Sequence, residues 1–206
     1  MKKVDGRYLC KMPFRTKPRD IPNNRTLAET RMKYLCRKLQ RDETVKAAYV
    51  KCMEGYIRDG YARKVSDAEL KSDGQYGVWY VPHHAVTNPK KPGKVRVVFD
   101  CAAKYAGKSL NDHLYTGPDI VNSLLGVLFR FRQEPVAIVG DVEMMYLRSK
   151  VYPEDEKFLR ILWWTGGDLD KKPETYSMTS DIWCCIIWFQ RDTGTASMCG
   201  RRHLKI

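Results

Sequence analysis

The chain has 206 residues, of which 43% are hydrophobic and 30% are charged, and its formal net charge is +13. This balance is typical of a globular protein with one sizeable core and excludes a wholly disordered chain. The basic excess favours a polyanionic partner, either a nucleic acid or an acidic membrane surface. The sequence contains no run of eighteen apolar residues and no apolar leader after Met1, so we expect an intracellular, unsecreted protein without a membrane span.

Residues 1–26 form a basic connector that is interrupted by Pro13, Pro18 and Pro22. Residues 6–14 can form one strand, centred on residues 7–10, and the rest reads as extended chain. The lysines and arginines of this segment fit either a solvated loop or contacts with phosphates.

Residues 27–72 are expected to contain a helical pair. Apolar side chains recur at i, i+4, i+7, i+8 and i+11, first from Ala28 to Leu39 and again from Val45 to Tyr56. Asp42 suits the start of the second helix and Gly60 its end. The two stripes predict an antiparallel pair whose apolar faces belong to the core.

A β-hairpin is predicted next, with strands at residues 78–86 and 94–100 and a turn at 88–93. Adjacent His83 and His84 would point to opposite faces of the first strand, and no further ligand stands at metal-binding spacing, so we expect no metal there. The seven cysteines form no Cys-x-x-Cys pair, which predicts free thiols in a reducing compartment.

The second strand of this hairpin alternates basic and apolar residues. Lys94 and Arg96 share one face, and Val95 and Val97 share the other. Together with the lysines of the turn, this basic face suits phosphates, although an ordinary solvated hairpin fits the same spacing. The turn lysines are Lys90 and Lys91.

An amphipathic helix is predicted over residues 121–128, followed by an uncharged run at residues 136–140 that stops at Asp141. Such a run is typical of a strand buried on both faces. Asp141 could cap a helix, close a turn or act as a functional carboxylate. Further strands are expected at residues 158–164 and 175–178.

Five blocks of this sequence, in their order and spacing, resemble the reverse transcriptases of Pao/BEL-type LTR retrotransposons. The blocks are WYVPHHAV (79–86), KVRVVFD (94–100), SLND (109–112), TGP (116–118) and GDVEMMY (140–146). The resemblance covers about residues 75–178, and the upstream helical pair resembles the segment that precedes the fingers. It implies an α+β fold: a partial right-hand polymerase, with fingers and an incomplete palm over residues 73–180, behind an N-terminal helical pair.

The resemblance also implies roles for individual residues. Asp141 matches the first catalytic, metal-binding aspartate of the palm, and the Val142 carbonyl matches a further ligand of Mg²⁺. Tyr146 matches the bulky residue beneath the incoming sugar, and Arg96 matches the arginine that grips the nucleotide phosphates. The lysines that would close over the triphosphate are Lys90, Lys91 and Lys94.

The sequence also departs from the family. No Tyr-x-Asp-Asp motif follows Asp141, and residues 181–206 shift abruptly in composition. Back-translated and read one nucleotide later, residues 181–188 can encode Thr-Tyr-Gly-Ala-Ala-Ser-Ser, which resembles the family's motif B. The glycine is forced by the Trp183–Cys184 junction. We therefore expect a divergent, out-of-frame tail, with coincidence between degenerate codons as the alternative.

The leading hypothesis is a fragment of an RNA-directed DNA polymerase that is inactive alone. Its expected partners are an RNA or DNA template–primer, a deoxynucleoside triphosphate and the remainder of the retrotransposon polyprotein. The alternative is a catalytically dead, basic nucleic-acid-binding remnant that holds phosphates without reading sequence. A third possibility is an unstable product without function.

Overall fold

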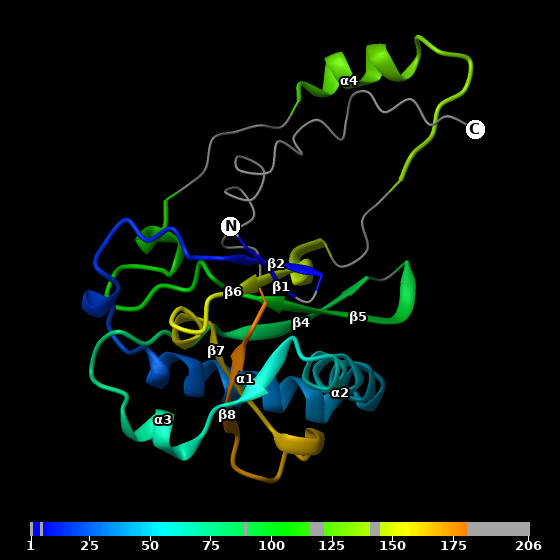
Figure 1. Cartoon of the computed structure of the whole chain (residues 1–206). Helices are drawn as coiled ribbons and strands as arrows, with labels where there is room; N and C mark the ends of the chain where they lie inside the picture. Colours follow the sequence, from blue (N-terminus) through cyan, green and yellow to red (C-terminus); the bar gives the residue numbers. More distant parts are fainter. Residues whose placement is uncertain (1, 5, 89, 116–121, 141–144, 181–206) are drawn as a thin grey trace.

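The computed structural model describes residues 2–4, 6–88, 90–115, 122–140 and 145–180, and these form a mixed α+β fold (Figure 1). Residues 181–206, with the expected out-of-frame tail, lie outside the described part. The described strands form three small sheets, which accompany two long helices. None of the described helices is both long and apolar enough to cross a membrane.

The first sheet joins the N-terminal segment to a much later part of the chain. Strand β1 (Lys2–Val4) pairs antiparallel with β2 (Arg7–Cys10), and β2 pairs in parallel with β6 (Ser149–Val151). The strand expected at residues 7–10 is therefore confirmed. The connector that follows contains one short 3-10 helix, η1 (Pro18–Asp20).

Both expected helices are present, as α1 (Arg25–Arg41) and α2 (Glu43–Arg58). Asp42 caps α2, because its Oδ1 accepts a hydrogen bond of 3.0 Å from the Val45 amide. The expected antiparallel arrangement is wrong: Figure 1 shows α1 running across the view and α2 nearly end-on. A single connecting residue is too short for the loop that an antiparallel helical hairpin needs.

The second sheet has the antiparallel order β3–β8–β7, and it confirms the two strands expected near the end of the described chain. Its strands are β3 (Ala62–Lys64), β7 (Arg160–Trp163) and β8 (Glu174–Met178). The first of those strands begins later than expected, because Phe158 belongs to the 3-10 helix η4 (Glu156–Phe158). The short helix α3 (Asp67–Lys71) follows β3.

The turn between β7 and β8, η5 (Thr165–Gly167), approaches α2 closely. Gly167 has φ +70°, and a Cβ built on it would lie 2.5 Å from Cγ1 of Val50. Glycine therefore satisfies both the left-handed backbone and the close packing at this point.

The hairpin consists of β4 (His83–Asn88) and β5 (Lys91–Phe99), paired antiparallel with an irregularity at Thr87/Asn88. The expected start at Val78 is wrong. Residues 78–81 are buried and run beside β7 through an isolated parallel bridge between Tyr80 and Arg160. The Val81 amide donates to the Arg160 carbonyl and the Trp79 carbonyl accepts from the Arg160 amide, so this stretch pairs outside the hairpin, which begins only at His83.

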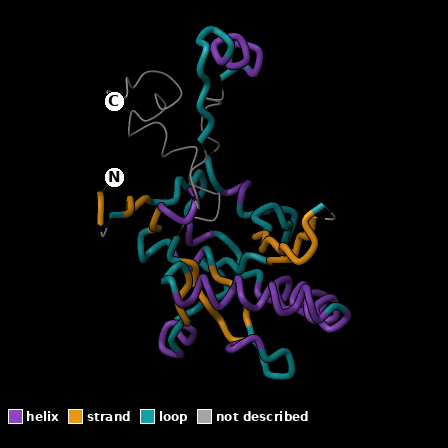
Figure 2. Tube along the Cα trace, turned by 90° about the vertical axis from the view of Figure 1, so that its right-hand side faces the viewer, coloured by secondary structure: helices purple, strands orange, loops and turns teal. Residues whose placement is uncertain are grey.

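Helix α4 (Leu124–Phe131) confirms a helix in the region predicted for residues 121–128, but it does not pack on the core. Leu124 is 72% exposed, and Figures 1 and 2 both show α4 standing away from the body of the molecule. The buried strand expected at residues 136–140 is contradicted, because Ile138 is 83% exposed and this run forms no strand. An apolar run becomes a strand only beside a pairing partner, and none of the described strands lies alongside.

The main core lies between the helices, the hairpin and the β3–β8–β7 sheet. Its largest fully buried side chains come mainly from the helices, the β3–β8–β7 sheet and the segment 78–81, and the hairpin adds the smaller Ala85 and Val95. The largest include Tyr49, Trp79, Tyr80, Phe158 and Trp163. This core fixes one face of the hairpin and leaves the other to solvent.

Candidate nucleic-acid interface

The two faces of the β4–β5 hairpin differ sharply in burial. Register places Ala85 opposite Val97 on the inner face, and Val95 also points inward. Ala85 is 2% exposed and Val95 is 8% exposed, because both pack against the core formed with α1 and α2. The inner face therefore anchors the hairpin, as its alternating sequence predicted.

The outer face, formed by His84, Val86, Lys94, Arg96 and Val98, is exposed to solvent. Val86 stands opposite Arg96, and His84 stands opposite Val98. Val86 and Val98 are 42% and 37% exposed. The face thus combines cationic side chains with a small apolar strip. Phosphates can pair with the cations while sugars or bases contact the valines.

A buried hydrogen-bond chain holds the start of the hairpin in place. The ring nitrogens of His83 lie 2.5 Å from the Tyr49 hydroxyl at Nδ1 and 2.8 Å from the Leu162 carbonyl oxygen at Nε2. Nε2 must carry the proton donated to the carbonyl, so Nδ1 accepts from the tyrosine. Burial lowers the pKa of His83 to about 4, which keeps the ring neutral. His83 is thus a structural link between α2, β4 and β7, while His84 points outward as predicted.

The predicted phosphate-binding residues all belong to the β4–β5 hairpin and its turn. Lys94 and Arg96 are exposed on the outer face, and Lys90 is exposed at the turn. The backbone of Lys91 opens β5. Within the described part of the chain, no carboxylate forms an ion pair with Lys90, Lys94 or Arg96. Their charges are therefore available to a ligand.

The predicted palm residues are only partly placed. Asp141 and Val142, the expected ligands of Mg²⁺, lie outside the described residues. Tyr146 belongs to the 3-10 helix η3 (Met145–Arg148), which leads directly into β6. Among the described residues, no three His, Cys, Asp or Glu side chains gather as a metal-binding group.

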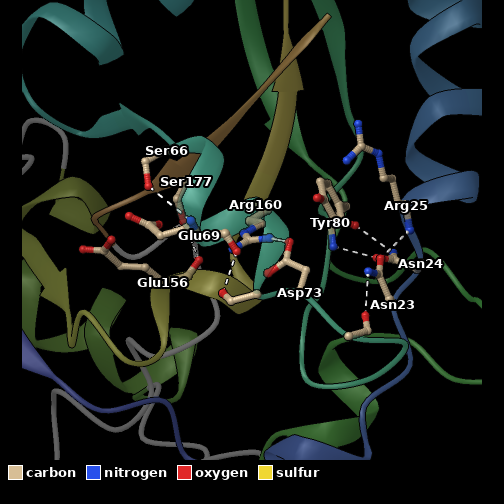
Figure 3. A network of polar contacts seen from close by, with 12 residues as sticks. Asn23, Asn24, Arg25, Ser66, Glu69, Asp73, Tyr80, Glu156, Arg160 and Ser177 are labelled. Atoms are coloured by element: carbon tan, nitrogen blue, oxygen red, sulfur yellow. Dashed lines mark hydrogen bonds and ion pairs between the residues drawn. The ribbon is translucent and has the colours of Figure 1, made fainter.

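Sequence reasoning missed a network of ion pairs that joins α3 and the loop after it to residues at the β3–β8–β7 sheet (Figure 3). Arg160, only 4% exposed, pairs with Asp73. Arg63 binds Glu69 at 3.1 Å and Glu156 at 2.8 Å. Burial lowers the pKa of Arg160 and raises the pKa of Glu156. A cavity of about 460 Å³ lies beside these groups.

This network ties a loop to the sheet instead of forming an obvious site. Its cations and carboxylates pair with one another, so they are already engaged. Nearby, the Asn24 side chain donates to the Tyr80 carbonyl at 2.7 Å and accepts from the Tyr80 amide at 2.6 Å. These contacts hold the segment before the hairpin against α1. No local sequence pattern could have predicted them, because each joins distant parts of the chain.

A second cavity, of about 300 Å³, lies where α1 meets the start of the hairpin. The apolar stripe of α1 gave no indication of this cavity, because only Leu35 of the stripe lines it. The signal that could have drawn attention to it is one polar stripe at helical spacing. Its members are Arg31, Tyr34 and Lys38.

No protein-family model matches the chain, and a search of the curated proteins found no match. Functional interpretation therefore depends on the motifs in the sequence and on the geometry described above.

Proposed function

We propose that this chain is the fingers and first part of the palm of an RNA-directed DNA polymerase of the Pao/BEL type. The observation that carries the proposal is the β4–β5 hairpin, which is anchored by the core on one face and carries Lys94 and Arg96 on the other. The resemblance assigns nucleotide phosphates to those two side chains.

The chemistry of the outer face supports phosphate binding. A guanidinium presents several N–H donors in one plane and can bind two phosphate oxygens together, whereas an ammonium acts as a mobile point charge. Arg96 supplies the first and Lys94 the second, two residues away on the same face. Because the inner face is fixed in the core, these groups need little reorganisation when a ligand binds.

The chain as given should not polymerise nucleotides on its own. Phosphoryl transfer of this class uses two metal ions held by several carboxylates, and Mg²⁺ would stabilise the charge on the phosphate oxygens. Asp141 and the Val142 carbonyl provide one carboxylate and one carbonyl, a donor set too small for two ions. The contribution of the described residues is to bind and orient phosphates.

A second function, nucleic-acid binding without catalysis, is supported by the same face. Lys90, Lys94 and Arg96 are exposed and carry their charges whether or not a metal site is complete. Such binding would depend on phosphates and not on base sequence. An assay of templated incorporation separates this alternative from an active polymerase.

The proposal can be tested with the full chain and a labelled primer–template. We expect Arg96→Glu to weaken binding and to reduce the slope of log affinity against log salt by about one, since about 0.7 to 0.9 is lost per phosphate contact. Lys51→Glu, which makes the same charge change at an exposed position of α2, is the matched control. Salt-independent binding, or equal effects of both variants, would contradict the proposed interface.

A further inference from the structure

We infer that the cavity between α1 and the hairpin holds one nucleotide of a single-stranded nucleic acid, with its base on Tyr34 and its phosphate between Arg31 and Lys38. This inference rests on the proposed nucleic-acid-binding function and adds a second contact region to it. It involves a helix to which the family resemblance assigns no ligand.

Helix α1 presents the three side chains on one face. Arg31, Tyr34, Leu35 and Lys38 stand at i, i+3, i+4 and i+7, so they follow one another along the helix surface. Leu35 is buried and fixes the face against the core. The cavity of about 300 Å³ between this face and the hairpin is at the lower end of the range for small-ligand sites, which suits a single nucleotide.

Tyr34 provides an accessible aromatic surface. Tyr34 is 61% exposed and lines the cavity, so its ring is accessible to a ligand there. The Arg37 guanidinium lies 5.8 Å from its ring centroid, which orients the ring from one side. An exposed tyrosine beside cations is the arrangement on which bases of single strands stack, without regard to sequence.

The cations of the cavity are positioned for a phosphate. Lys38 donates a hydrogen bond of 2.8 Å to the Ala85 carbonyl, which holds its ammonium at the junction of α1 and β4. Arg31 has no ion pair to any described residue. The one carboxylate in the lining is Asp100, whose Oδ1 accepts from the Ala102 amide at 3.1 Å.

A polymer fits this cavity better than a free nucleotide, because the outer face of the hairpin continues from it. His84 lines the cavity with Val98 opposite it, and the pair of Val86 and Arg96 comes next along the outer face of the hairpin. Residues two apart on a strand are separated by about 6.8 Å. A strand with one nucleotide in the cavity can therefore run along the apolar strip toward Arg96 and Lys94.

The test uses the full chain and a fluorescent single-stranded oligonucleotide of about twelve nucleotides, a length within known site sizes. Anisotropy is followed from about 50 to 200 mM salt. Arg31→Glu should weaken binding about tenfold and reduce the salt slope by about one. Lys33→Glu makes the same charge change on the same helix, outside the cavity, and should change affinity less than about threefold with little change in slope.

Tyr34 gives a readout that charge alone would not produce. Tyr34→Ala should weaken binding at least about fivefold with an unchanged salt slope, because base stacking releases no counterions. Tyr34→Phe keeps the ring and should retain the affinity. Circular dichroism should be the same for all variants, since the altered side chains are exposed.

The outcomes separate this inference from the proposed function. If the unaltered chain shows no salt-dependent binding, the proposed function itself fails. If it binds, and Arg96→Glu weakens it while Arg31→Glu and Tyr34→Ala behave like Lys33→Glu, only the nucleotide cavity is refuted. Displacement of the oligonucleotide by poly-glutamate at equal charge concentration would also refute it, because an acidic peptide offers no base for Tyr34. Displacement by a free mononucleotide as effectively as by the oligonucleotide would refute the extended path along the hairpin.

Discussion

Acidification should destabilise this protein through His83. The ring is fully enclosed and its pKa falls from the ordinary 6.5 to about 4, because burial disfavours the charged form. The unfolded chain therefore binds a proton at higher pH than the folded chain does. Stability from this group is complete above pH 6.5 and is lost as the pH falls from 6.5 through about 4.

The interval between those two pKa values sets the size of the effect. It corresponds to at most about 3.4 kcal/mol, of which about 2.5 kcal/mol is lost between pH 7.5 and 4.5. The measurement is urea unfolding, followed by the fluorescence of the buried tryptophans at a series of pH values. Subtracting the same series for His83→Gln isolates the histidine, because the carboxylates are common to both proteins.

Two controls sharpen this experiment. His84→Gln removes the exposed neighbour and should leave the pH dependence of stability unchanged. Tyr49→Phe removes the hydroxyl that donates to Nδ1 of His83, so an acceptor is left unpaired and stability should fall by about 1 to 3 kcal/mol at neutral pH. If the unaltered chain and His83→Gln lose stability in parallel on acidification, the conclusion that His83 is buried and neutral in the folded protein is wrong.

Four further outcomes are expected. Gly167→Ala should cost about 2 to 3 kcal/mol in thermal unfolding, against about 1 kcal/mol for Gly166→Ala, because only the former meets a neighbouring side chain; equal losses would contradict the close approach. Arg160→Met should destabilise by about 3 kcal/mol in urea, because it strands a mostly buried carboxylate, and a neutral result would mean that the ion pair is dispensable. Phe129→Glu should leave unfolding unchanged while reducing aggregation measured by light scattering, since its ring is exposed. Templated incorporation with Mg²⁺ should be absent, and incorporation that disappears in Asp141→Ala would refute the claim that more carboxylates are needed.

Local patterns predicted the parts of the fold that depend on local periodicity. The apolar stripes of α1 and α2 and the alternation of Lys94 to Val97 each follow from one element contacting one core. The predictions failed where the structure of a segment depends on whether another strand lies beside it. The apolar residues 136–140 look like a buried strand but have no described strand beside them, whereas the equally apolar residues 78–81 are buried against β7.

The candidate site likewise has a part that local sequence predicts and a part that depends on the tertiary structure. Strand alternation placed Lys94 and Arg96 on one face and Lys90 at the turn, and all three residues are exposed in the structure. The cavity beside Tyr34 needed the relative position of α1 and the hairpin, which no single segment encodes. The pair between Arg160 and Asp73 spans 87 residues and is equally inaccessible to local reasoning.

The strand order β3–β8–β7 has a consequence for how this protein is made. The middle strand, β8, is synthesised after both of its neighbours, and β3 precedes it by more than a hundred residues. Until β8 leaves the ribosome, the nascent chain exposes two strand edges that have no partner in this sheet. Such edges are open to pairing with other chains, and the long separation between partners slows folding. Synthesis that slows just before residue 174 should therefore promote aggregation of the nascent protein more than a delay after residue 178.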